Sequence, residues 1–192
     1  MTRKSLLLAS LGLVAISHAS TSDKVLAGAK LQLRAPANYT PGYFRIGYPN
    51  GDLPSSQGVC TDVVIRSFRN AGFDLQRLIH EDMRKHFSQY PRRESKPDSN
   101  IDHRRVPNLV HFFGKFGRKL PTSVVGTQLA TWKAGDIVFW KLNNGLDHCG
   151  IISDTRSRKG LPLVIHNINR TTEEDVLTTW KIVGHFRYGG RQ

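Results

Sequence analysis

The hydrophobic pattern in the first half of the chain has the period of a helix. Four apolar side chains fall on one helical face: Val64, Ile65, Phe68 and Ala71. Gly72 follows them as a stop signal, so we predict a helix over residues 60–71. Three further helices are predicted over residues 24–34, 75–87 and 109–116, the first of them ended by Pro36.

Beyond residue 121 the helical period gives way to short runs of β-branched and aromatic residues separated by turn-like segments. These runs predict an antiparallel meander of strands over residues 136–140, 148–153, 163–168 and 182–188. Another strand is predicted over residues 43–48, before a turn-like sequence. Because helices precede strands, we expect an α+β domain with its helices packed on one face of the sheet.

The start of the chain has the pattern of a secretory signal. Arg3 and Lys4 precede an apolar run over residues 6–16, and small residues follow it. The run is shorter than the roughly 20 residues that a membrane-spanning helix needs, and the alternative is an N-terminal core helix. We predict a signal peptide over residues 1–19, an N-terminal segment over 20–42 and one domain over 43–192. The protein is then exported, to the periplasm or out of the cell.

Composition and charge narrow the class of partner. With 192 residues, 39% of them hydrophobic, the chain can bury a core, and 2 Cys exclude a disulfide scaffold. The net charge of +13 becomes +11 once Arg3 and Lys4 leave with the signal, and it favours an anionic partner. Export favours peptidoglycan or another anionic envelope polymer over nucleic acid. We predict no transmembrane segment, and the oligomeric state stays open.

Cys60 lies where a loop is predicted to become a helix. The positive end of the helix dipole and the free N–H groups there favour a thiolate, the reactive form of cysteine. The same N–H groups can hold the oxyanion that forms when a thiolate attacks an acyl carbon. Cys60 is therefore a candidate nucleophile, which needs a base.

Two histidines are brought together by the predicted hairpin of residues 148–153 and 163–168. If Ser153 pairs near Leu163, paired positions sum to about 316, so His148 faces Asn167 or its neighbour His166. A Cys, a His and an orienting polar residue form the usual constellation of thiol hydrolases. His166 or Asn167 is the candidate for the orienting role.

The two cysteines allow other interpretations. Cys60 and Cys149 can form a disulfide in an oxidising compartment, or both can be inert core residues. Alternation along a strand places Cys149 on the face opposite His148, so if His148 faces Cys60 then Cys149 points away from it into the core. The spacing alone leaves the catalytic, disulfide and core interpretations open.

Four segments resemble the NlpC-type cell-wall cysteine peptidases: GVCTDVVIRSFRNAGFDL, WKAGDIVFW, HCGIISD and LVIHN. The resemblance implies a papain-like α+β fold and cleavage of amide bonds in peptidoglycan stem peptides. It matches Cys60 to the nucleophile, His148 to the base and His166 to the third position. The segments HEDM, NIDHRRVPNL, GDIV, HNI and GHFRY are also similar to a bacterial family of unknown function, numbered twelve-eighty-seven, over nearly the whole mature chain.

The chain departs from the NlpC pattern around the cysteine. The usual acidic residue before the nucleophile is absent, and Asp62 follows Cys60 instead. Asp62 suits the first turn of a helix, but its negative charge opposes thiolate formation. The polar segment 90–107, which contains Asp102 and His103, is an additional long loop, and loops of that length are usually functional or mobile.

Further candidates for substrate binding are polar residues near the predicted site: Tyr48, Asp62, His103, Arg104 and Arg105. The two arginines can clamp a substrate carboxylate, or pair with Asp98 or Asp102 within their loop. Tyr48 can add a hydroxyl to the oxyanion site or pack as an ordinary aromatic residue. The acids and histidines over residues 80–86 have the wrong spacing for zinc, so no metal or other cofactor is expected.

These observations predict an exported cysteine hydrolase with Cys60 as nucleophile, His148 as base, and His166 or Asn167 as the residue that fixes the imidazole. The predicted reaction is amide cleavage, in peptidoglycan stems. Two alternatives remain: a non-catalytic envelope-binding module on the same fold, and an acyltransferase that needs an acyl-donor pocket.

Overall fold

The computed structural model describes residues 19–91 and 95–190; the predicted signal peptide lies outside this range except for residue 19. The helices are α1 (Thr21–Gln32), α2 (Cys60–Asn70), α3 (Leu75–His86) and α4 (Val106–Phe116), with 3-10 turns at Phe87–Gln89, Asp102–Arg104 and Gly126–Thr131. The strands are β1 (Asn38–Tyr39), β2 (Gln57–Gly58), β3 (Arg118–Lys119), β4 (Ile137–Lys141), β5 (Asp147–Arg156), β6 (Pro162–Asn167), β7 (Thr171–Glu174) and β8 (Lys181–Arg187).

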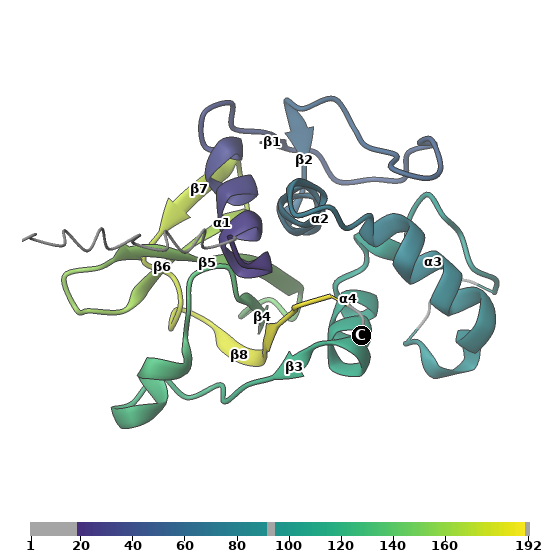
Figure 1. The fold of residues 1–192 in the computed structure, drawn as a ribbon. Coiled ribbons are helices and arrows are strands. Elements are labelled where there is room, and N and C mark those ends of the chain that lie inside the picture. The colour runs from purple at the N-terminus through teal and green to yellow at the C-terminus, as the bar shows by residue number, and fades with distance from the viewer. Residues whose placement is uncertain (1–18, 92–94, 191–192) are drawn as a thin grey trace, which may run out of the picture.

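Helices and an antiparallel sheet confirm the predicted α+β class. The sheet has six strands in the order β3-β8-β4-β5-β6-β7. Figure 1 shows α1, α2 and α4 beside this sheet, with α3 farther out. One face of the sheet packs against the helices through Ile137, Phe139, Cys149, Ile151, Ile165 and Phe186. The other face carries a smaller cluster of Trp132, Val138, Trp140, Ile152, Val164 and Leu177.

Helix α2 is central because it is buried along nearly its whole length. Its buried residues run from Cys60 to Ile65 and continue with Ser67 and Phe68. Helix α1 covers one side of it, and β5 covers another. Gly28 permits the close approach of α1, since a Cβ there would lie 2.6 Å from the Cβ of Asn70. The segment before residue 43 thus packs on α2.

The register of the predicted hairpin is confirmed. Gly150 pairs with His166, Ile151 with Ile165 and Ile152 with Val164, so the paired numbers sum to 316. The prediction of a simple meander is wrong for the last strands. Strand β8 returns beside β4 instead of following β6, and β7 takes the place next to β6. The sequence TTEE of β7 is polar and gave no alternating hydrophobic signal.

The strand predicted over residues 43–48 is not formed. Side chains satisfy the backbone there instead of a neighbouring strand: Ile46 N donates to Asn100 Oδ1 at 2.9 Å, and Gly47 O accepts from Gln76 Nε2 at 2.8 Å. The predicted loop over residues 90–107 contains regular structure at its end, the 3-10 turn and the first residues of α4. Ile101 and Asp102 are buried there, at the start of a 3-10 turn.

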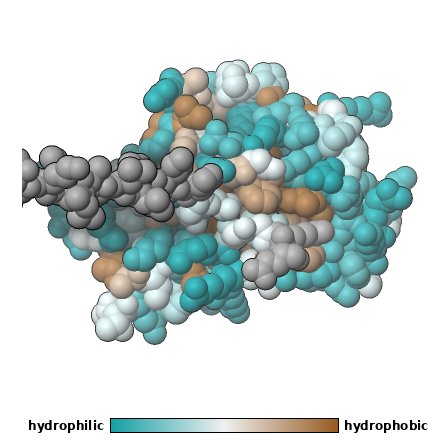
Figure 2. Space-filling view, in the orientation of Figure 1, coloured by the Kyte–Doolittle hydropathy of each residue, from teal (hydrophilic) through white to brown (hydrophobic). Residues whose placement is uncertain are grey.

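Hydrophilic residues cover most of the face shown in Figure 2. Within residues 19–91 and 95–190, no helix combines the length and the apolar character that crossing a bilayer requires.

Asp136, directly before β4, joins the start of that strand to the end of β8. Its buried carboxylate accepts from Arg187 Nε at 2.6 Å and lies 2.9 Å from His185 Nε2, both on β8. The indole of Trp132 stacks on His185 with ring centroids 3.6 Å apart. This network holds β8 beside β4.

Asp136→Asn is expected to lower the free energy of unfolding by about 1–3 kcal/mol, because it weakens the charged hydrogen bonds that join the buried carboxylate to the partly exposed Arg187 and to His185. The measurement is chemical denaturation followed by circular dichroism. The matched control Asp175→Asn, at an exposed position, should change stability by less than about 0.5 kcal/mol. A loss no larger than that of the control would show that the network contributes little.

Candidate functional site

Cys60 is the first residue of α2, and it is buried with 7% of its surface exposed. Val59 precedes Cys60 in extended conformation, and the N–H of Val59 donates to Asp62 Oδ2 at 2.7 Å. This bond fixes the loop where it enters the helix. The first-turn N–H groups of a helix lack acceptors within the helix, so they are placed to hold a negative charge beside Cys60.

The start of β5 lies beside this end of α2. The Cys149 thiol donates a hydrogen bond to Cys60, and His148 makes a second one. These bonds, together with the charge of His148, lower the pKa of the Cys60 thiol to about 5 against the opposing effect of burial. Cys60 is therefore poised to be a thiolate at neutral pH.

The expectation that Cys149 points away from Cys60 is wrong. Cys149 lies on the helix-covered face and belongs to the same apolar cluster as Cys60. Because Cys60 lies beside the first residues of β5, it contacts side chains from two successive positions, His148 and Cys149. Both cysteines are free thiols. Burial and the nearby Cys60 thiolate raise the pKa of Cys149 well above its ordinary value, which suits it as a donor.

His148 and His166 form a direct pair. The His148 Nε2 atom lies 2.9 Å from His166 Nδ1, and their rings are nearly perpendicular. Trp140 stacks against His148 with centroids 5.6 Å apart, and Trp180 meets the same ring edge-on. Because Nε2 of His148 faces His166, Nδ1 of His148 is the ring nitrogen that can face Cys60. Burial and the neighbouring His148 lower the pKa of His166 to about 4, so His166 is neutral at neutral pH.

Gly150 makes room for this pair. It lies opposite His166 on the neighbouring strand, and a Cβ at Gly150 would come 2.7 Å from Val164 Cγ1 and 3.1 Å from the Cβ of His166. Any side chain there would push β6 away from β5. The glycine therefore lets His166 reach diagonally across to His148.

Asn167, the alternative third residue, takes a different position. Its amide Nδ2 donates to Ala37 O at 3.0 Å and lies 3.5 Å from Gly58 O. The structure thus places His166, and not Asn167, against His148. Asn167 ties β6 to the loop that leads into Cys60.

Asp62 and Arg104 neutralise each other in the core. The guanidinium of Arg104 donates through Nε to Asp62 Oδ1 at 3.0 Å and through NH2 to Oδ2 at 2.9 Å. Both side chains are about 95% buried. The pairing of Arg104 within its own loop is therefore not observed, and Arg104 is committed to Asp62. Its charge offsets the carboxylate that was expected to oppose thiolate formation at Cys60.

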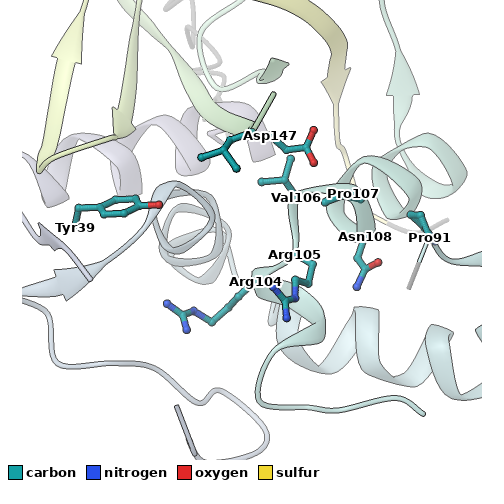
Figure 3. A pocket seen from close by; sticks show the side chains of 9 residues that line it. Tyr39, Pro91, Arg104, Arg105, Val106, Pro107, Asn108 and Asp147 are labelled. Atoms are coloured by element: carbon teal, nitrogen blue, oxygen red, sulfur yellow. The ribbon is translucent and has the colours of Figure 1, made fainter. Parts of the chain in front are cut away.

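A cleft of about 190 Å³ opens beside Cys60, lined also by Tyr39, Arg105 and Asp147. A second compartment of about 180 Å³ shares these three residues and extends towards Asn108 (Figure 3). In Figure 3 the hydroxyl of Tyr39 points towards the middle of this compartment. The cleft thus offers Cys60 access from solvent between a phenol, a guanidinium and a carboxylate.

Tyr39 was not predicted from the sequence. It lies in a short, polar stretch with no motif around it. The pairing of β1 with β2 and a hydrogen bond from its N–H to Asn169 O bring it to the cleft. Tyr48, which was predicted, packs edge-on against His80 at 5.3 Å and does not line the cleft at Cys60. His103 is 1% exposed and does not line that cleft either, and burial lowers its pKa to about 3.

Each of the two histidines of α3 is paired with an aspartate. His80 Nδ1 lies 3.2 Å from Asp102 Oδ2, and His86 Nδ1 lies 3.1 Å from Asp82 Oδ1. In the part of the chain that the structure describes, no group of three or more His, Cys, Asp or Glu residues is arranged to hold a metal ion.

Comparison with known proteins assigns the chain to a family. The sequence pattern of DUF1287, described as a domain of unknown function, matches residues 26–188, and the chain belongs to this family. It is 49% identical over 174 residues to the uncharacterized protein YijF of Escherichia coli strain K12, covering 89% of this chain and 83% of that protein. No solved structure matches the fold.

Alkylation of Cys60 by iodoacetamide is expected to show a pH midpoint near 5, well below the value of about 8.5 for an ordinary thiol. The measurement is mass-spectrometric labelling as a function of pH. Cys149→Ala should move the midpoint upwards because it removes a donor, whereas Cys149→Ser keeps a donor and should hold it low. A midpoint near 8.5 in the wild-type protein, or a Cys60–Cys149 disulfide, would contradict the thiolate.

Proposed function

We propose that this member of the DUF1287 family is an exported cysteine hydrolase that cleaves amide bonds, with an NlpC-type papain-like fold. The observation that carries the proposal is the arrangement of Cys60, at the start of α2, with the paired His148 and His166. The Cys60 thiolate attacks the carbonyl carbon of the substrate. First-turn N–H groups of α2 stabilise the oxyanion, and the positive His148 gives its proton to the leaving amine. Water, activated by the now neutral His148, then releases the acyl group from Cys60.

The neutral His166 supports this sequence of steps. Its Nδ1 can accept from Nε2–H of His148, and it thereby stabilises the positive imidazole and fixes its orientation. The stacked Trp140 and the edge of Trp180 limit rotation of the His148 ring. The geometry corresponds to that of a base held by a third residue.

The substrate we propose is the peptide part of peptidoglycan. The chain carries a net charge of +13, and Arg105 lines the cleft beside Cys60. Stem peptides of peptidoglycan carry carboxylates that a guanidinium can bind in a two-point fork. The predicted signal peptide would bring the enzyme to the compartment where this polymer lies.

An acyltransferase is the second candidate, and a neighbouring cavity favours it. A cleft of about 560 Å³ adjoins the site at Val106 and Asp147, and Tyr90, Val110 and Val183 are among the residues that line it. Such a compartment suits an apolar portion of an acyl donor or acceptor. In this reaction an amine, and not water, would take the acyl group from Cys60.

Purified sacculi are expected to release stem-peptide fragments when incubated with the mature protein. Cys60→Ala should abolish release, and His148→Ala should slow it by about 10²–10⁴-fold. Mass spectrometry separates the candidates, because hydrolysis adds water to the fragment whereas transfer adds the acceptor amine. The control is Cys149→Ser, which leaves the proposed nucleophile in place. Equal release by wild type and Cys60→Ala, or none by either from several wall types, would contradict the proposal.

Arg105→Ala is expected to lower kcat/KM by about 10–100-fold, mainly through KM, because a charged hydrogen bond to substrate is lost. Arg104→Ala is the matched comparison, since it leaves Asp62 buried without its partner and should cost about 3–5 kcal/mol of unfolding free energy. The measurements are steady-state kinetics on a soluble stem peptide and thermal unfolding. An unchanged KM in Arg105→Ala would remove Arg105 from substrate binding.

A further inference from the structure

Three neighbouring strands align His148, His166 and Glu174 on one face of the sheet. Gly150 is opposite His166, so His148 lies diagonally to His166 across the β5–β6 pair. Val164 is opposite Glu174, so Glu174 lies diagonally to His166 across the β6–β7 pair. The strand register alone therefore puts a carboxylate beside the histidine that contacts His148.

The side-chain distances agree with this register. His166 is fully buried, and its Nε2 atom lies 3.3 Å from Glu174 Oε2, although the geometry of this contact is not that of a formed hydrogen bond. The charged and titratable groups that act on His166 are His148 from β5 and Glu174 from β7. Its other ring neighbours are the indoles of Trp140 and Trp180. The carboxylate of Glu174 is thus close enough to accept from His166 Nε2–H.

The proton position on His166 matters because a neutral imidazole carries one N–H. When His148 is charged, its Nε2–H donates to His166 only if Nδ1 of His166 is unprotonated. The proton of His166 must then lie on Nε2, in a buried place where an unsatisfied N–H is costly. An acceptor close to Nε2 selects this tautomer over the other one.

We propose that Glu174 is a positioning residue that holds His166 in the Nε2–H tautomer, so that His166 accepts from His148 and supports the Cys60 thiolate. This role rests on the proposed cysteine-hydrolase function. Glu174 lies beside His166 and acts through it. Its side chain is 47% exposed, so it also joins the buried pair to solvent.

The adjacent acid provides a matched control. Glu173 is opposite Ile165, which lies on the helix-covered face of the sheet. Its Oε1 accepts from Lys30 Nζ at 2.8 Å and also from Ser153 Oγ. Glu173 thus shares the strand and the charge of Glu174, but it belongs to another network.

The experiment compares Glu174→Ala, Glu174→Gln and Glu173→Ala by three readouts: imidazole ¹⁵N shifts of His166, the pH midpoint of Cys60 alkylation, and kinetics on a stem peptide. Glu174→Ala should reduce the Nε2–H tautomer, raise the alkylation midpoint, and lower kcat at least about tenfold with KM within about twofold. Glu174→Gln, whose amide oxygen can still accept, should retain most of the wild-type behaviour. Glu173→Ala should leave the tautomer and the midpoint unchanged.

An unchanged tautomer and an unchanged alkylation midpoint in Glu174→Ala would overturn the role of Glu174, as would equal shifts in Glu173→Ala. The first two readouts need no substrate. If the wild-type protein cleaves no wall peptide, the proposed function fails, while those two readouts still decide whether Glu174 sets the tautomer of His166.

Discussion

The packing of the N-terminal end of α2 against the start of β5 is the contact on which the candidate site depends. Helix α2 is buried by α1 on one side and the sheet on another, which fixes where its first residue lies. Cys60 then meets His148 and Cys149 together, and their hydrogen bonds outweigh burial in setting its pKa. A buried thiol without these partners would have a raised pKa and low reactivity.

Charge compensation in the core makes this packing compatible with a thiolate. Asp62 caps the backbone before Cys60, and the buried Arg104 offsets its charge. The arginine comes from the segment that is additional to the NlpC pattern, so this segment supports the core beneath the site. Arg104 and Arg105 both line the cleft beside Cys60, and Arg104 is in addition held by its buried ion pair with Asp62.

The parts of the site that the sequence predicted correctly are those governed by local periodicity. Helix α2, strands β5 and β6, and the register between these strands follow from alternation and from the length of one turn. This was enough to bring His148 to His166. The strand predicted at residues 43–48 does not form, because side chains of Asn100 and Gln76, distant in the chain, make hydrogen bonds to the backbone there. The polar strand β7, and with it Glu174, gave no hydrophobic signal.

The sequence by itself determined the α+β class, the position of Cys60 at a helix start and the pairing of two strand histidines, because each depends on short-range spacing. Only the tertiary structure decided that Cys149 contacts Cys60, that Arg104 serves Asp62 and that Tyr39 lines the cleft. The choice of His166 over Asn167 also came from the fold. These outcomes depend on how separate elements pack and on which buried charges must be neutralised, and the spacing of residues along one strand or helix does not specify either.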